Sequence, residues 1–313
     1  MKGSSEVVYL DVEKQLEYSK KFPSFINSLP WNHFGRKNIG FLFVIEQGAE
    51  AIWDFDDDNV VKPNLNPVFP KDGENIDVNV PQGHTLRSYN PYPSLGASEK
   101  IVWPRGLPLH DVLNELSYNA TLKTVSMPGA DIGVVQSAAD HDPDVDGIYR
   151  LTHKLPFYFG KPSETKPILF PERSLTPLNA QACLFKKSAF FMLFLPISVH
   201  GRVSDIWRSY FGQRLLWDAG IKVLYSTSYV DQYRNAHNYL GDVNAEIPLY
   251  ERSGVLVDFL REWKSDMPTL SNRMEELFIA LYERGYIEEK DVSMIQSWLV
   301  ILEEIGYEFP VIK

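Results

Sequence analysis

Apolar and polar positions alternate along this chain with two different periods, which divide it into two regions. Up to about residue 60, short apolar runs that suit strands alternate with a longer apolar segment, residues 39–45, which precedes Gly48. This alternation predicts an α/β core, and a glycine just after an apolar helical run predicts the end of that helix. From residue 254 onward, apolar residues recur at helical spacing, so we expect packed helices that end near Gly285 and Gly306.

The middle of the chain contains three further apolar segments. Residues 132–137 are typical of a buried strand, and residues 189–199 form an apolar run long enough to require burial. Residues 202–215 combine apolar positions at helical spacing with charged ones, and Gly220 is expected to end that helix. The pattern therefore predicts helices and strands well beyond residue 60.

Residues 61–108 are rich in proline and glycine, which predicts a long loop with short extended pieces. We expect this loop to overhang a ligand site. Its aromatic residues Tyr89, Tyr92 and Trp103 suit either sugar stacking or anchoring of the loop. The predicted organisation is a domain over residues 1–253, with this loop inserted, followed by a helical extension over residues 254–313.

Composition and charge limit the classes of partner. The chain has 313 residues, 44% of them hydrophobic, with a formal net charge of -10 and a pI near 5.2. An acidic chain of this kind is a poor match for nucleic acid or an anionic membrane. We find neither a membrane span nor a signal peptide within residues 1–20. The single cysteine, Cys183, excludes an internal disulfide and is expected to be a buried small residue.

Four aspartates crowd five positions after the apolar run 51–53: Asp54, Asp56, Asp57 and Asp58. Carboxylates this close repel one another, so a shared divalent cation would favour their ordering. If the backbone stays extended, Asp54, Asp56 and Asp58 converge on one face and Asp57 points elsewhere. The alternative is a solvated acidic turn that closes a strand.

Basic and amide donors stand directly before the predicted helix at residues 39–45, as Arg36, Lys37 and Asn38. Unpaired backbone N–H groups at a helix N-terminus, with such side chains beside them, form a natural seat for a pyrophosphate. The alternative is an ordinary surface helix start. The close succession of donors, helix, strand and acids favours a function.

A second acidic run follows the predicted strand at residues 132–137 and resembles the start of a calcium loop. An EF-hand is excluded because His153 occupies the twelfth position, where a bidentate glutamate is required, and Pro143 the second. The remaining alternatives are a helix cap at Asp142 and an acidic site on the acceptor side. His153 itself is expected to pack or to form hydrogen bonds. The acidic residues of this run are Asp140, Asp142, Asp144 and Asp146.

Several ordered blocks of the chain resemble the STELLO family of glycosyltransferases. The blocks cover residues 36–49, 52–57, 143–152, 177–181, 204–208 and 212–217. The resemblance extends over roughly residues 30–265. It implies an α/β, GT-A-like mixed sheet flanked by helices, and the helical C-terminal tail follows that sheet.

This resemblance also implies an activity and its ligands. It implies a nucleotide-sugar donor, with a UDP-sugar as the choice, a carbohydrate or glycoconjugate acceptor, and Mn²⁺ or Mg²⁺ as cofactor. It further implies residence in the secretory pathway, within the Golgi lumen. Family members carry a membrane anchor and an opening strand that helps to hold the nucleotide, and this chain is expected to begin beyond both, at residues 7–10. The sugar and the stereochemical course are not specified.

Roles for individual residues follow from the resemblance and the motifs together. Asp56 and Asp58 are predicted to carry the ion, and Asp205 is the predicted base that acts on the acceptor hydroxyl. A salt bridge of Asp205 with Arg202 or Arg208 is the competing interpretation. The predicted substrate-binding residues are Arg36, Lys37, Asn38, Asp54 (at the ribose), Arg208, Gln213 and Arg214.

Two other functions remain open from the sequence. The chain suits a non-catalytic relative that binds a protein partner such as another glycosyltransferase complex. It also suits a phosphatase of the haloacid dehalogenase type with Asp54 as nucleophile. The phosphatase motif requires Thr or Val two residues after the second aspartate, and this chain has Asp58 at that position.

Overall fold

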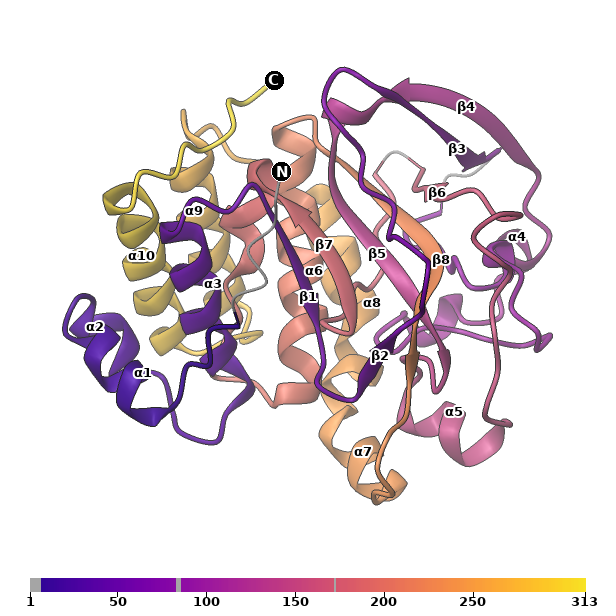
Figure 1. Ribbon diagram of the computed structural model, residues 1–313, viewed down its shortest axis with the longest axis horizontal. Helices are drawn as coiled ribbons and strands as arrows, with labels where there is room; N and C mark the ends of the chain where they lie inside the picture. Colours follow the sequence, from indigo (N-terminus) through magenta and orange to yellow (C-terminus); the bar gives the residue numbers. More distant parts are fainter. Residues whose placement is uncertain (1–6, 83–85, 172) are drawn as a thin grey trace.

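Strands from both halves of the chain pair into one mixed sheet (Figure 1). The computed structural model describes residues 7–82, 86–171 and 173–313. The strands in this part of the chain are β1 (Ala51–Phe55), β2 (Asn59–Val61), β3 (Asn75–Pro81), β4 (Leu122–Pro128), β5 (Ile132–His141), β6 (Ile168–Leu169), β7 (Ala182–Lys186) and β8 (Lys222–Gln232).

The order of the strands brings three carboxyl ends to one edge of the sheet. The order is β1-β7-β5-β8-β6-β3-β4, and β2 pairs with β8 outside this path. Strands β1 and β5 both run antiparallel to β7, and β8 runs parallel to β5. Strands β1, β5 and β8 therefore point the same way. Crevices beyond the carboxyl ends of parallel strands are common ligand sites in α/β proteins.

Helices pack against the sheet, and several of them lie beyond one of its edges. Figure 1 shows α1, α2, α3, α9 and α10 on the side away from β3 and β4, and α6 beside the central strands. Short 3-10 turns occur at Phe34–Arg36, Pro93–Leu95, Leu109–Asp111, Gly129–Asp131 and Lys187–Leu193. The α-helices are α1 (Val12–Ser19), α2 (Pro23–Ile26), α3 (Lys37–Glu46), α4 (Glu115–Tyr118), α5 (Gly147–Thr152), α6 (Gly201–Asp218), α7 (Tyr239–Ala245), α8 (Ile247–Glu262), α9 (Leu270–Glu283) and α10 (Glu289–Glu304).

Most of the predicted elements near the site are confirmed. The apolar segment at residues 39–45 lies in α3, and Gly48 follows it with φ 78°. The strand predicted at residues 132–137 is the first part of β5. The helix predicted at residues 202–215 is α6, which ends just before Gly220, with φ 66°. A positive φ suits glycine because it has no Cβ, which explains both helix ends.

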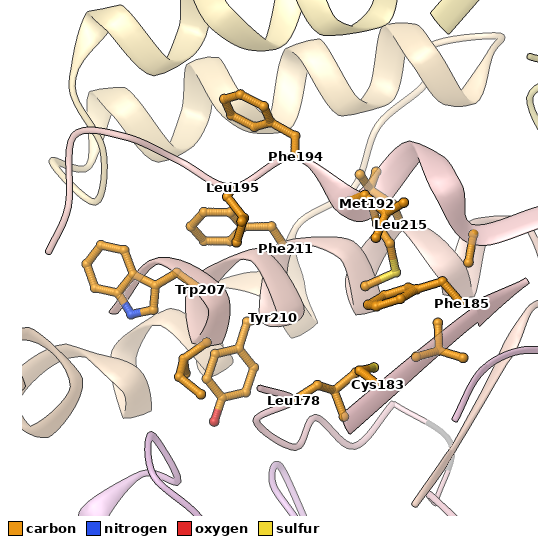
Figure 2. Packing of buried hydrophobic residues seen from close by; sticks show 14 of the residues in the cluster. Leu178, Cys183, Phe185, Met192, Phe194, Leu195, Trp207, Tyr210, Phe211 and Leu215 are labelled. Carbon is orange, nitrogen blue, oxygen red and sulfur yellow. The ribbon is translucent and has the colours of Figure 1, made fainter. Parts of the chain in front are cut away.

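The core around α6 is built mainly from aromatic and aliphatic side chains. Figure 2 shows Trp207 and Phe211 of α6 on one side of the buried run after β7, whose Phe194 points to the other side. Cys183 of β7 is fully buried at the base of the same cluster, as predicted. Gly212 gives Met192 room, since a Cβ at that position would meet the Met192 side chain. Tight packing here fixes the position of the first turns of α6.

The C-terminal helices share this core. Leu277 and Phe278 of α9 and Trp298 of α10 belong to the same buried cluster as Phe194 and Phe211. Gly285 and Gly306 end α9 and α10 with φ 67° and 80°, so the predicted stops are confirmed. The boundary predicted between residues 253 and 254 lies inside α8, a continuous helix.

The long proline- and glycine-rich region is mostly irregular, with β3 as its main extended piece. The aromatic residues Tyr89, Tyr92 and Trp103 are buried, so they anchor the loop rather than offer a face to a sugar. No helix among the described residues is both long and apolar enough to cross a lipid bilayer.

Candidate functional site

The acidic cluster lies at the carboxyl end of β1, in the turn that leads to β2. Strand β1 ends at Phe55, and the backbone N–H of Asn59 donates to the Asp56 carbonyl at 3.2 Å, closing the turn. The extended conformation therefore does not persist through Asp58. The orientation predicted for Asp57 depended on an extended backbone and does not apply to this turn, in which Asp56, Asp57 and Asp58 line the same cleft.

This cleft has a volume of about 420 Å³ and lies beyond the carboxyl ends of β1 and β8. We call it the charged cleft because both signs of charge line it in abundance. Residues of the β1–β2 turn, the start of α6 and the segment after β8 contribute to it. Its lining residues are Phe34, Asp56, Asp57, Asp58, Arg105, Gly201, Arg202, Asp205, Gln232, Arg234, Asn235, His237 and Asp242.

Lys37, at the first position of α3, joins the strand tip to the helix. Its ammonium donates to Asp54 Oδ1 at 2.8 Å and to Asp56 Oδ1 at 3.2 Å. Burial lowers the pKa of Lys37, but the two carboxylates outweigh burial and raise it. Burial raises the pKa of Asp56 to about 6, with Lys37 acting against the shift and Asp205 and Asp54 adding to it. A nearby positive charge would therefore stabilise the ionised form of Asp56.

Asp54 lies behind this cleft rather than in it. It is only 5% exposed, and its second oxygen is 3.4 Å from Nη1 of Arg208. Arg208 is itself buried, and its guanidinium lies near the rings of Phe41 and Phe185. The predicted roles of Asp54 at the ribose and of Arg208 in substrate binding stay predictions. Their contacts serve to hold Lys37 and β1 in place.

The other two members of the predicted donor triplet point away from Lys37. Arg36 donates to Gln15 Oε1 at 2.9 and 2.6 Å and to the Leu29 carbonyl at 3.0 Å. Asn38 is fully buried, with its amide paired to both the N–H and the carbonyl of Leu195. Of the triplet, only Lys37 touches the acidic turn, while Asn38 ties α3 to the buried run.

Asp205 reaches the charged cleft from the second turn of α6. Its carboxylate accepts from Nη1 and Nη2 of Arg105 at 3.1 and 2.8 Å, and from the backbone N–H groups of Ile206 and Ala180 at 2.9 and 3.2 Å. The structure thus shows an ion pair at Asp205, with Arg105 as partner instead of Arg202 or Arg208. Its predicted role as a base stays a prediction.

Arg105 is buried between two carboxylates. Its Nε donates to Asp144 Oδ1 at 2.9 Å, and the carboxylates of Asp144 and Asp205 raise its pKa well above the usual value although burial opposes this. Burial favours the neutral form of Asp144, yet Arg105 and Arg234 outweigh it and lower the pKa of Asp144. Arg234 Nη2 lies 3.6 Å from the same oxygen of Asp144. Asp144 therefore holds two arginines at the wall of the cleft.

The second acidic run caps a helix, as one alternative predicted, but through another residue. Asp146 is the N-cap of α5, and its carboxylate accepts from the Tyr149 N–H at 2.7 Å. Asp142 was the expected cap; instead it accepts from Nη1 of Arg150 at 2.6 Å. The predicted packing role of His153 is confirmed, because its ring stacks on Tyr149 with centroids 4.7 Å apart.

Gln213 and Arg214 lie further along α6 and do not line the charged cleft. Gln213 donates to the Thr176 and Ser209 carbonyls at 2.7 and 3.0 Å. Arg214 pairs with Asp218 at 2.7 Å and donates to the Trp263 carbonyl. Their predicted substrate-binding role stays a prediction, and these contacts tie α6 to the loops around it.

Sequence reasoning missed three basic residues that line the cleft, Arg105, Arg234 and His237, and considered Arg202 only as an ion-pair partner of Asp205. Arg105 stands in the proline-rich loop, and Arg234 and His237 follow β8. The useful signal was topological, since a loop after a strand parallel to β1 and β5 must emerge at the same sheet edge. Arg105 is the residue of the region 61–108 that lines this cleft, and the predicted overhang of a ligand site stays a prediction.

The acidic turn has the chemistry to hold a divalent cation. Asp56 Oδ1 accepts from Lys37, and Asp58 Oδ1 accepts from Gln232 Nε2 at 2.9 Å. The second oxygen of each carboxylate accepts no hydrogen bond from the described residues. These residues contain no group of three or more side chains placed to bind a metal. Mg²⁺ and similar ions are often bound by one or two carboxylates plus phosphate oxygens, which this turn fits.

Comparison with known proteins agrees with the resemblance predicted from sequence. Residues 202–313 match the family model described as STELLO glycosyltransferases. The chain is 31% identical over 97% of its length to "Probable glycosyltransferase STELLO2" of Arabidopsis thaliana, and 31% identical over 99% to "Probable glycosyltransferase STELLO1" of the same plant. It spans about 40% of the length of each. The resemblance to the STELLO glycosyltransferases is confirmed.

Proposed function

We propose that this chain, a relative of the STELLO glycosyltransferases, binds a UDP-sugar with Mn²⁺ or Mg²⁺ and transfers the sugar to a carbohydrate or glycoconjugate acceptor. The observation that supports this most directly is the charged cleft at the carboxyl ends of β1 and β8. There, two carboxylates suited to an ion face a wall of basic side chains. Such an arrangement suits a ligand that is itself an ion–diphosphate complex.

Asp56 and Asp58 are the residues that would hold the ion. When bound, a divalent cation neutralises the charge that develops on a diphosphate leaving group. Lys37 holds Asp56 beside Asp54, at 3.2 and 2.8 Å from its ammonium, so the side of the carboxylate away from Lys37 is free to face the cleft. Gln232 orients Asp58 in the same way.

The arginines of the cleft wall supply the remaining charge. Arg105 is fixed by the carboxylates of Asp144 and Asp205, so little side-chain freedom is lost when it meets a phosphate oxygen. Arg234 is less constrained, with Nη2 3.6 Å from Asp144 and Nε buried without a partner among the described residues. We propose that Arg105 and Arg234 hold the diphosphate from the side opposite the acidic turn.

We consider two roles for Asp205, positioning of Arg105 and general base, and steady-state kinetics distinguishes them. The four hydrogen bonds that Asp205 accepts come from Arg105 and from two backbone N–H groups, which favours the positioning of Arg105. If Asp205 only positions Arg105, Asp205→Asn should raise KM for the donor more than it lowers kcat. If it is the base, the same change should lower kcat by 100-fold or more, on the order expected for general-base catalysis.

A thermal-shift screen of nucleotide sugars with Mn²⁺ tests the proposal, because a ligand that binds only the folded state raises the midpoint. We expect UDP to raise Tm in the presence of Mn²⁺ and Asp56→Ala to abolish that shift. Asp266→Ala, which removes an exposed carboxylate outside the cleft, is the matched control and should keep it. An unchanged shift in Asp56→Ala would refute the placement of the ion.

The two alternatives predict different results. A non-catalytic binding partner would show no binding of UDP with Mn²⁺ at millimolar concentration. A phosphatase would need Asp54 to attack phosphorus, yet Asp54 is 5% exposed and paired with Lys37 and Arg208. The phosphatase function would be supported if the wild type hydrolysed an aryl phosphate and Asp54→Asn did not.

A further inference from the structure

A second cleft adjoins the charged cleft on the other side of the acidic turn. It has a volume of about 620 Å³ and shares Phe34, Asp56 and Asp57 with the charged cleft. We call it the aromatic cleft because several ring side chains line it. Its lining residues are Val12, Gln15, Trp31, Asn32, His33, Phe34, Arg36, Lys37, Phe55, Asp56 and Asp57.

The aromatic cleft presents large ring surfaces that the fold leaves uncovered. Trp31 is 52% exposed and Phe55, the last residue of β1, is 42% exposed. The guanidinium of Arg36 lies 3.7 Å from the centre of the Trp31 ring. Arg36 is in turn fixed by Gln15 and the Leu29 carbonyl. Trp31 is therefore held from one face and is exposed to solvent over half its surface.

The charges of the two clefts differ. Arg105, Arg202 and Arg234 all lie in the charged cleft. Only two long basic side chains, Arg36 and Lys37, are among the lining residues of the aromatic cleft, and four ring side chains line it with them. The arginines of the charged cleft are ion-paired, as Lys37 is, so the clefts differ in their number of arginines and of exposed rings. The aromatic cleft is thus the better match for a flat, uncharged group than for a phosphate.

We propose that the aromatic cleft is the nucleoside subsite of the donor, in which Trp31 stacks on the base. This rests on the proposed function. In a nucleotide sugar, the diphosphate joins the nucleoside to the sugar. With the diphosphate at Asp56 and Asp58, these two groups would extend in different directions, and a cleft borders the acidic turn on each side. The sugar, rich in hydroxyl groups, suits the hydrogen-bonding side chains of the charged cleft, whereas a base has a π-face for stacking on a ring.

Calorimetry with UDP and with pyrophosphate, each with Mn²⁺, tests this assignment on the whole chain. Base–aromatic stacking is lost in Trp31→Ala, so we expect its affinity for UDP to fall about five- to hundredfold while its affinity for pyrophosphate stays that of the wild type. Trp31→Phe should recover most of the UDP affinity. Tyr282→Ala, at a similarly exposed ring outside both clefts, should bind both ligands normally.

Each contrary result has a distinct meaning. Unchanged UDP affinity in Trp31→Ala, with pyrophosphate bound, overturns the subsite and leaves the proposed function intact. Equal losses for UDP and pyrophosphate also overturn it, because stacking acts on the base alone. If the wild type binds neither ligand, the proposed function fails and the subsite fails with it. Should Trp31→Ala not fold, the 5-fluorotryptophan resonance of Trp31 in the wild-type chain decides, since it must shift with UDP and not with pyrophosphate.

Discussion

Two acidic segments of this chain look alike in sequence and differ in the structure. Each contains four aspartates and follows an apolar strand, β1 in one case and β5 in the other. Every carboxylate of the β5 segment has a partner in the fold, although one oxygen of Asp142 and one of Asp144 accept no hydrogen bond from the described residues. Asp140 pairs with Lys62, Asp142 with Arg150 and Asp144 with Arg105, while Asp146 caps α5.

The carboxylates of the turn after β1 are less buried than Asp144 and Asp146. Asp56 and Asp58 each have one oxygen engaged by the described residues, and Asp57 is exposed. The difference arises because the sheet brings basic side chains from distant loops to the β5 segment, while the β1 turn borders open clefts. Two acidic runs that look alike in sequence therefore differ in how deeply the fold buries them and in how many arginines it brings to them.

The largest effect in this comparison is expected at Asp144. Asp144→Ala leaves the buried Arg105 and the partly buried Arg234 with less opposing charge, and removal of one partner from a buried pair typically costs about 3–5 kcal/mol. We expect a loss of that size in the free energy of unfolding, measured by urea denaturation at pH 7. A loss below about 1 kcal/mol would mean that the ion pairs behind the cleft are not structural.

A pH-dependent effect is expected at Asp146. Burial raises the pKa of Asp146 to about 6, although Tyr149 and Trp103 donate hydrogen bonds to it. A carboxyl with a raised pKa contributes stability below its unfolded pKa, and that contribution is lost as the pH rises through about 6.

Asp146→Asn keeps a capping oxygen but does not titrate. The stability of the wild type relative to Asp146→Asn should therefore fall by about 1–3 kcal/mol between pH 4 and pH 7. Urea unfolding of both proteins across that range is the measurement. A constant difference would show that Asp146 keeps an ordinary pKa.

The smallest effect is expected at Asp57. Its side chain is exposed and takes no ion pair among the described residues, so Asp57→Ala should change the free energy of unfolding by no more than about 0.5 kcal/mol. The same urea titration used for Asp144→Ala gives the comparison. If Asp57→Ala lowered the free energy of unfolding by several kcal/mol, the two acidic segments would not differ in their contribution to stability.

The fold could be predicted largely from the sequence near the site. The spacing of apolar residues was sufficient to predict α3, β5 and α6, because each of these elements buries one face of apolar side chains. At the end of β1 the sequence left two alternatives open, an extended backbone through Asp58 and an acidic turn that closes the strand, and the structure shows the turn at Asp56.

The site could be predicted only in part. The acidic turn and Lys37 are local to β1 and α3, so their spacing carried the information. Arg36, Asn38, Gln213 and Arg214 look equally polar in sequence, and the contacts that the structure shows for them are with other parts of the chain. A polar residue type alone does not tell whether its partner is another part of the chain or a ligand.

The sequence by itself determined the α/β class, the helical tail, the acidic turn and the resemblance to the STELLO family, because these depend on order and spacing along the chain. Only the tertiary structure decided which charges remain for a ligand. Arg105 and Asp205 are a hundred residues apart and meet at 2.8 Å, and such pairings depend on where strands end in space. The same physical reason placed Trp31 beside Phe55 in one cleft.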